Sequence, residues 1–292
     1  MMTLANELTK YWEIQLDPTN KDSKVDNWVQ YKKQIHSQRG NHIPHISGTG
    51  AIIGRLRLER HEVRVNYLLR VTFLVRQAHF FYHEEQLCEH QAIFYKGKLI
   101  EDKLVTTPIS NEPKQIEQRS IDKNDRFSNQ RFNYDRRAAV NYAERWWDDY
   151  NPAYKQFDVD CTNFVSQALH AGGAPMRGYP DRAKGWWYRD NNWSYSWAVA
   201  HSLRWYLSGS TQGLKGKEVD SANQLLPGDV ICYDFEGDGK WNHNTIVVMK
   251  DQEGMPLVNA HTNNSRHRYW SYEDSYAWTP ECQYKFFQIG VN

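Results

Sequence analysis

The most constraining feature of the sequence is a long alternation of apolar and polar side chains between residues 63 and 76. Val, Tyr, Leu or Phe occupies every second position, and Arg, Asn or Thr fills most positions between them. Because successive side chains of a strand point to opposite faces, this pattern predicts a strand with one buried face. Such a strand needs hydrogen-bonded neighbours, and residues 52–58, 87–95 and 99–105 have the composition to supply them in an antiparallel sheet.

Two segments before these strands have helical periodicity. Apolar residues recur three and four positions apart over residues 4–12 and 25–35, and Asp17-Pro18 marks a break between the two segments. Helices followed by a curved antiparallel sheet predict a small α+β module, which we assign to residues 1–105.

A polar stretch follows this module. Residues 106–133 contain two prolines and show no sustained apolar period, which is typical of a linker. The remaining residues, 134–292, have helical patterns first and strand-like runs afterwards, so they predict a second α+β domain. Its strand-like runs lie at residues 229–233, 244–249, 257–261 and 284–289.

Composition excludes several classes of protein. The formal net charge of +1 leaves no basic excess to neutralise phosphates, so we expect no nucleic acid partner. The four cysteines are far apart and show no CxxC spacing, so we expect no zinc site and separate thiols in a reducing compartment, with a Cys232–Cys282 bridge as the alternative. We expect no cofactor. The sequence shows neither a signal peptide nor a run of membrane-spanning length, and we take the cytoplasm as the default location. The oligomeric state stays open.

The candidate nucleophile is Cys161, at the start of a predicted helix. Apolar residues follow it at helical spacing up to Leu169, and Gly172-Gly173 provides a helix end. A thiol at a helix N-terminus meets unpaired N–H groups and the positive end of the helix dipole, so we expect the thiolate to be favoured. The alternative interpretation is a buried structural cysteine.

A cysteine nucleophile needs a base, and a base needs an orienting partner. His243 is the candidate base because it begins a buried strand after a glycine-containing turn. Asn259 and His261 lie two residues apart on the next strand, so they share a face and either could orient the ring of His243. We favour Asn259, because it lies deeper in the apolar run, where a neutral amide is easier to bury. All three could instead be ordinary polar residues of a sheet.

The cysteine motif resembles a known family. Residues 160–167 (DCTNFVSQ) with 171–173 (AGG), preceded by 134–143 (YDRRAAVNYA), are similar to the bacterial putative amidase domain family, which resembles the NlpC and CHAP peptidases of the papain-like superfamily. The resemblance covers residue 134 to the C-terminus. It implies a papain-like domain whose nucleophile helix packs on an antiparallel sheet, with a histidine beginning a strand and a polar residue on the next. Likeness to the NlpC pattern also favours Asn259 over His261.

The resemblance implies hydrolysis of an amide bond through an acyl-enzyme, with a cell-wall (peptidoglycan-derived) peptide as the substrate class by analogy. An acyl- or amide-transferase with the same Cys161–His243 dyad would share the chemistry up to the acyl-enzyme. A binding module with an idle site is the second alternative.

Two further groups of residues were candidates for binding. A tryptophan-rich region could line a groove for a sugar or a peptide, or could be core; its residues are Trp186, Trp187, Trp193 and Trp197. The acidic turn with Asp234, Glu236 and Asp238 shares features with a calcium loop but lacks its distal glutamate, so we expect a solvated turn without a metal.

Overall fold

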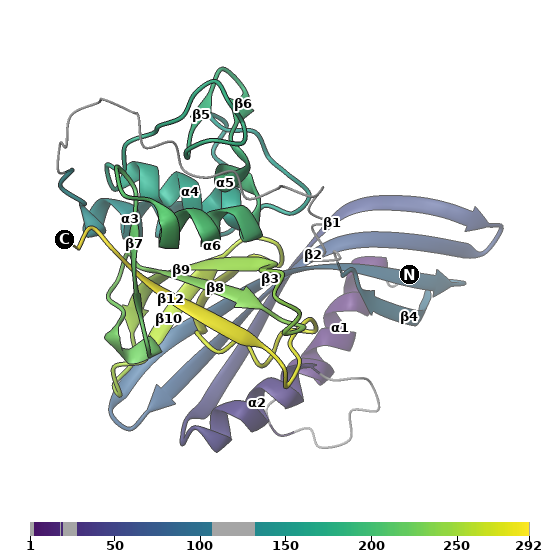
Figure 1. Cartoon of the computed structure of the whole chain (residues 1–292). Helices are drawn as coiled ribbons and strands as arrows, with labels where there is room; N and C mark the ends of the chain where they lie inside the picture. The colour runs from purple at the N-terminus through teal and green to yellow at the C-terminus, as the bar shows by residue number, and fades with distance from the viewer. Residues whose placement is uncertain (1–2, 18, 20–27, 107–131, 292) are drawn as a thin grey trace. The chain divides into compact units, whose positions relative to one another are not determined.

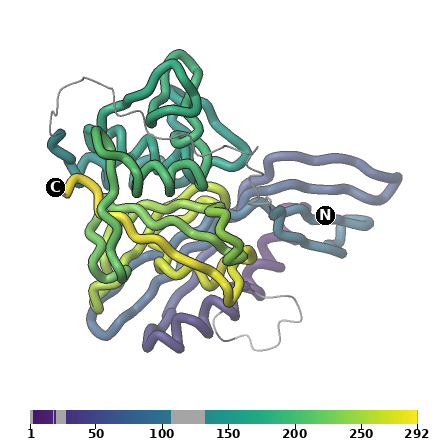
Figure 2. Tube along the Cα trace, viewed as in Figure 1, coloured from purple at the N-terminus to yellow at the C-terminus, as the bar shows by residue number. Residues whose placement is uncertain are grey.

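The computed structural model describes residues 3–17, 19, 28–106 and 132–291. These residues divide into two compact units (Figures 1 and 2). The N-terminal unit contains the described residues up to 106 and residues 263–265. The C-terminal unit contains residues 132–262 and 266–291. The predicted linker, residues 106–133, lies almost wholly outside the described residues.

The N-terminal unit has two helices and an antiparallel sheet with the strand order β1-β2-β3-β4. Its elements are α1 (Leu4–Leu16), α2 (Trp28–Gln38), β1 (His42–Glu59), β2 (Glu62–Gln77), β3 (Phe80–Tyr95) and β4 (Lys98–Leu104). The predicted alternation lies in β2, where one face is buried and includes Val65, Val71 and Phe73 at 0% exposure. The predicted neighbours fall within β1, β3 and β4 and pair antiparallel as expected.

Strand β1 begins ten residues earlier than the apolar pattern predicted, at His42 rather than Ile52. The residues of this extension include Gly48 and Gly50, and most of their side chains are exposed. Backbone pairing with β2, from His42 opposite Arg76 onward, carries the strand through a segment that has no apolar period to reveal it.

The C-terminal unit is also α+β. Its helices are α3 (Arg136–Trp146), α4 (Cys161–Ala171), α5 (Tyr195–Ala198), α6 (Ala200–Gly209) and the short η1 (Ala222–Gln224). Its strands are β5 (Tyr188–Arg189), β6 (Asn192–Trp193), β7 (Gly216–Val219), β8 (Val230–Asp234), β9 (His243–Lys250), β10 (Pro256–Ala260), β11 (Ser265–Tyr269) and β12 (Gln283–Ile289). The main strands follow the order β11-β10-β9-β8-β12-β7, and β5 pairs only with β6.

Helices α3, α4 and α6 lie over one face of this sheet (Figure 1). Ile246 and Val248 of β9 belong to the core beneath the helices, whereas Val247 belongs to a second core on the other face. Because side chains alternate along a strand, Asn244 shares the helix face and His243 the opposite face. This parity determines what each polar residue of β9 can contact.

The helix predicted to begin at Cys161 forms as expected. Helix α4 begins at Cys161 and ends at Ala171, and its apolar residues Phe164, Val165 and Leu169 are fully buried. Gly173 ends the turn with a φ of +89°, a conformation that favours glycine. Within the described residues, the structure has no helix with the length and apolarity needed to span a membrane.

Candidate functional site

Cys161 is the first residue of α4, and its side chain is 0% exposed. Its Sγ lies 3.7 Å from Oγ1 of Thr162, and the backbone N–H of Asn244 also hydrogen-bonds to it. Burial raises the pKa of the thiol, and the hydrogen bonds from Asn244 and Thr162 offset this only in part. The expectation that the helix start would favour the thiolate is therefore wrong for this closed arrangement, because desolvation outweighs the donors.

His243 is the first residue of β9 and is also fully buried. The rings of Tyr233, Phe235 and Tyr272 surround it, with centroids 5.5, 5.8 and 5.1 Å away. Neither ring nitrogen has a hydrogen-bond partner among the described residues, so no bond to Cys161 is formed. Burial, with a contribution from Arg268, lowers the pKa of His243 to about 3. The ring is therefore neutral near pH 7, which is the form that a general base requires.

Asn259 does not reach His243. Its Nδ2 donates to the backbone carbonyl of Ala143 at 3.2 Å and to Oε1 of Glu144 at 3.0 Å, and its Oδ1 accepts from the backbone N–H of His267 at 2.9 Å. The predicted contact between Asn259 and His243 does not form because the two side chains lie on opposite faces of the sheet. Asn259 is paired with Ile246, three residues after His243, so it leaves the sheet on the helix face and His243 leaves it on the other.

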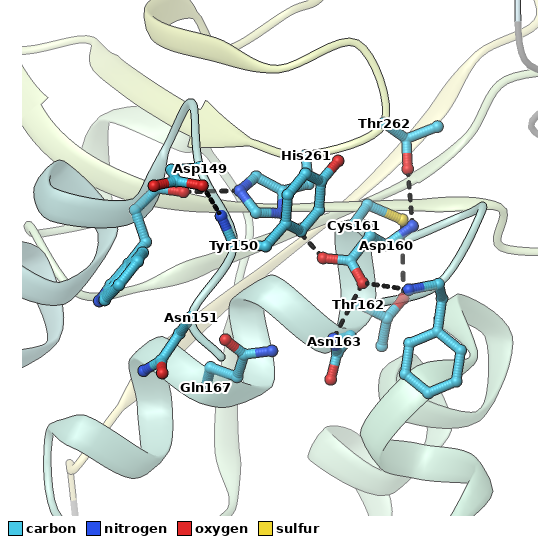
Figure 3. A network of polar contacts seen from close by, with 12 residues as sticks. Asp149, Tyr150, Asn151, Asp160, Cys161, Thr162, Asn163, Gln167, His261 and Thr262 are labelled. Atoms are coloured by element: carbon cyan, nitrogen blue, oxygen red, sulfur yellow. Dashed lines mark hydrogen bonds and ion pairs between the residues drawn. The ribbon is translucent and has the colours of Figure 1, made fainter. Parts of the chain in front are cut away.

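His261 contacts the residue before the nucleophile instead of His243 (Figure 3). Its Nδ1 lies 2.8 Å from Oδ2 of Asp160, its Nε2 lies 2.7 Å from the carbonyl oxygen of Trp146, and its ring stacks on Phe164 at 4.1 Å. Both ring nitrogens therefore face oxygen atoms of the turn before α4 and of α3. The alternative orienter is thus also occupied elsewhere.

The carboxylate of Asp160 bonds to the preceding turn, to Asn163 and to His261. Its Oδ1 accepts hydrogen bonds from the backbone N–H of Phe157 at 3.0 Å and from Nδ2 of Asn163 at 2.9 Å. Its own N–H donates to Oγ1 of Thr262 at 2.9 Å (Figure 3). These bonds fix the turn that places Cys161 at the helix start.

Two polar residues next to Cys161 and His243 in the sequence were not among the predicted site residues. Thr162 and Asn244 are fully buried, and Nδ2 of Asn244 donates to Oγ1 of Thr162 at 2.9 Å. The sequence signal that could have identified them is that Thr162 follows Cys161 and Asn244 follows His243. Only the three-dimensional pairing of α4 with the helix face of β9 brings them together.

Three of the four predicted tryptophans lie in the core rather than in a groove. Trp186, Trp187 and Trp197 are at most 1% exposed. Two of them bond to α4 itself: Nε1 of Trp186 donates to Oγ of Ser166, and Nε1 of Trp197 donates to Oδ1 of Asn163. Their burial follows from the large apolar area that an indole removes from water.

Trp193 is the exception, because its side chain is only half-buried. The cationic groups of Lys155 and Arg182 lie 5.0 and 4.9 Å from its ring. Lys155 also helps to line a hollow of about 570 Å³, and its backbone carbonyl accepts a hydrogen bond from Asn163 of α4. The remaining lining residues of the hollow are Pro152, Ala153, Tyr154, Tyr188, Asp190 and Asn191.

The acidic turn is held by its own backbone. The carboxylate of Asp234 accepts hydrogen bonds from the N–H groups of Gly237, Asp238 and Gly239. Across the ranges that the structure describes, no group of three or more His, Cys, Asp or Glu side chains is arranged to hold a metal ion.

Comparison with known proteins places this site in a family. The family described as the putative amidase domain matches residues 133–287. An uncharacterized Bacillus subtilis protein, YhbB, is 64% identical over 156 residues, which are 53% of this chain and 50% of YhbB. A second uncharacterized protein of that organism, YjcM, is 34% identical over 140 residues, which are 45% of this chain and 31% of YjcM. The chain thus spans half or less of the length of these relatives, and no solved structure matches it.

Proposed function

Because the chain belongs to the putative amidase domain family, we propose that its C-terminal unit hydrolyses an amide bond through an acyl-enzyme on Cys161. The observation that carries the proposal is the position of the thiol. Cys161 begins α4, its sulfur accepts a hydrogen bond from the backbone of Asn244, and the neighbouring residue on β9 is a neutral histidine. The order of Cys and His along the chain also supports a papain-like relationship to the NlpC and CHAP peptidases.

In the proposed reaction, His243 takes the proton of Cys161 and the sulfur attacks the carbonyl carbon of the substrate. The backbone N–H of Cys161, at the open start of α4, donates to the developing oxyanion. His243 then gives the proton to the leaving amine, and water hydrolyses the thioester. His243 leaves β9 on the face opposite α4, and no hydrogen bond joins its ring to Cys161 in the described arrangement. The proposed proton transfer therefore requires the His243 ring to change rotamer at the start of β9 and reach the sulfur when substrate binds.

A peptide derived from the cell wall is the proposed substrate class, by analogy with the NlpC and CHAP relatives. The hollow beside α4 supports an extended, polar ligand, because it combines the cation of Lys155 and the carboxylate of Asp190 with the rings of Tyr154 and Tyr188. At the sulfur itself, Oδ1 of Asn244 has no partner among the described residues and can accept from an amide N–H of the substrate.

The test is an assay of the full chain against peptidoglycan fragments and small amides, with detection of the released amine. Cys161→Ala should abolish turnover and retain the fold, since the side chain is small and begins a helix. Cys282→Ala is the matched control, because that thiol is the one free cysteine among the described residues that is not buried. Intact mass of the enzyme with substrate should show an acyl adduct in wild type and in Cys282→Ala, and none in Cys161→Ala.

Full turnover by Cys161→Ala would refute the mechanism. An added amine acceptor separates the alternatives, because a transferase would form the amide of that acceptor whereas a hydrolase releases the acid. Failure of Cys161 to react with a thiol-directed amide analogue would instead support an idle binding module.

A further inference from the structure

We infer that Thr162 and Asn244 form a relay that stabilises the thiolate of Cys161, with Thr162 as the hydrogen-bond donor and Asn244 as the residue that orients it. The inference deepens the proposed function and rests on it in one respect, that Cys161 is the nucleophile. Both residues act through the sulfur and are positioning residues.

The geometry of the three side chains supports this relay. Asn244 lies on the helix face of β9, and its Nδ2 is 2.9 Å from Oγ1 of Thr162, which in turn is 3.7 Å from the sulfur. All three side chains are 0% exposed, so no solvent water competes for these bonds. A hydrogen bond in such surroundings is stronger than the same bond in water.

The directions of the bonds follow from the chemistry of each group. An amide nitrogen can only donate, so Asn244 occupies a lone pair of the Thr162 hydroxyl and leaves its single hydrogen free to point at the sulfur. A thiol could act as donor or acceptor towards that hydroxyl, but a thiolate can only accept. The relay therefore favours the thiolate over the thiol.

Asn244 contributes a second time through its backbone. Its N–H hydrogen-bonds to the same sulfur, so one residue of β9 donates directly and orients a second donor. These donors oppose the burial of the sulfur and the charge of Asp160 before α4, which both raise the pKa of Cys161. The other titratable neighbour is Cys232 on β8, whose own pKa is raised by burial and by Cys161. The site needs such donors, because a buried thiol beside a carboxylate is otherwise held in the neutral form.

The experiment measures the rate at which iodoacetamide alkylates Cys161 of the full chain as a function of pH, with the site followed by peptide mass. Thr162→Val keeps the shape of the side chain and removes the hydroxyl. Below the pKa of the thiol, alkylation should become about ten- to a hundredfold slower, the scale of losing one hydrogen bond to a charged group. Above the thiol pKa of both proteins the two rates should converge, because Cys161 is then fully ionised in each.

Three further variants keep the test decisive. Thr162→Ser should restore the wild-type profile, since it restores the hydroxyl. In Asn244→Asp, the new carboxylate accepts the hydrogen of the Thr162 hydroxyl, which then cannot point at the sulfur. This variant should therefore raise the midpoint of the pH–alkylation curve of Cys161 at least as far as Thr162→Val does. Ser166→Ala removes another buried hydroxyl of α4, one that bonds to Trp186 and Trp197, and should leave the midpoint unchanged.

The outcomes separate this inference from the proposed function, because alkylation requires no turnover. An unchanged midpoint in Thr162→Val would overturn the relay even if Cys161 proved to be the nucleophile. A rate difference that persists at every pH would also overturn it, since that pattern reports altered access to the sulfur. A shifted midpoint in a protein that hydrolyses no amide would support the relay and leave the reaction to be sought elsewhere.

Discussion

At the scale of single residues, His243 has the most distinctive surroundings of the proposed site. Three aromatic rings enclose a histidine whose nitrogens have no hydrogen-bond partner among the described residues. Such burial disfavours the charged ring, which lowers the pKa of His243 to about 3. A base with so low a pKa is weak, so its environment must change when substrate enters if it is to accept the proton of Cys161.

The same pKa predicts how stability depends on pH. In the unfolded chain His243 binds a proton at its ordinary pKa of 6.5, whereas in the folded chain it does so only near 3. Between these values the unfolded state holds more protons, so the contribution of His243 is complete above pH 6.5 and is lost as the pH falls towards 3. His243→Phe should lack this loss. In wild type it amounts to on the order of 3–5 kcal/mol in the free energy of unfolding by the time the pH reaches the folded-state pKa of His243.

Urea unfolding of both proteins at a series of pH values between about 7 and 4 measures this difference. Burial alone would raise the pKa of Glu144, but His267 and Arg266 lower it to about 2. The contribution of Glu144 to the stability of the folded protein is therefore also lost in acid. That loss is common to both proteins and cancels in the comparison. Parallel curves for wild type and His243→Phe would contradict the prediction.

Asn259 gives the second prediction at this scale. Its amide connects α3 to His267 of β11 and makes no hydrogen bond to Cys161 or His243. Asn259→Ala leaves buried groups without partners, so we expect a loss of about 2–4 kcal/mol in the free energy of unfolding. We expect no shift in the pH profile of turnover. A shifted profile in a variant of normal stability would return Asn259 to the role of orienter.

At the scale of elements, the sequence predicted α4 well because two local signals agree there. The apolar spacing after Cys161 and the glycine pair after Ala171 specify the same helix. The partner of His243 could not be predicted in the same way. Asn259 and His261 were correctly placed on the segment after β9, but their face relative to His243 depends on the register of β10 against β9, which is irregular between Leu257 and Val258.

The same limit explains the tryptophans. Spacing showed that indoles gather before α6, but it could not distinguish a groove from a core. Trp186 and Trp197 are buried because α4 offers Ser166 and Asn163 as acceptors for their N–H groups. Those acceptors lie far away in the sequence, so the choice between the two interpretations is made by tertiary packing.

The Asp160–His261 pair gives the prediction at the scale of elements. It joins the residue after β10 to the residue before α4 and is almost fully buried, with 2% and 3% of the two side chains exposed. Removing one partner of a buried ion pair leaves an uncompensated charge, which typically costs about 3–5 kcal/mol. Asp160→Asn and His261→Gln should each destabilise the protein on this scale, and the double variant should lose clearly less than the sum.

A double-mutant cycle by urea unfolding measures this coupling. Additive losses would show that the two residues act independently. Alkylation of Cys161 in the same proteins gives a second measurement, because the turn that Asp160 fixes also places the thiol at the start of α4.

At the scale of the whole molecule, the sequence correctly indicated an α+β protein, and it placed all the candidate site residues in the C-terminal half. The two cores of that unit are built from its own helices and strands, on either face of β8 and β9. The matched family covers nearly the same residues, 133–287. The sequence did not predict that residues 263–265 group with the N-terminal unit. A segment of three residues is too short to carry a pattern that would reveal this grouping.

These observations predict that a fragment from residue 132 to the C-terminus folds alone. Its buried residues, including Phe164, Ile246 and Val258, find their partners inside the fragment, so we expect one cooperative unfolding transition and a Cys161 thiol as slow to alkylate as in the full chain. Limited proteolysis of the full chain should cut between Thr106 and Asn133 and release this fragment. As a control, the fragment with Phe164→Ala should expose the thiol, because a core side chain beneath α4 is lost. If the wild-type fragment aggregates, or if its thiol reacts as fast as in the Phe164→Ala fragment, the C-terminal unit depends on residues 1–131 for its core.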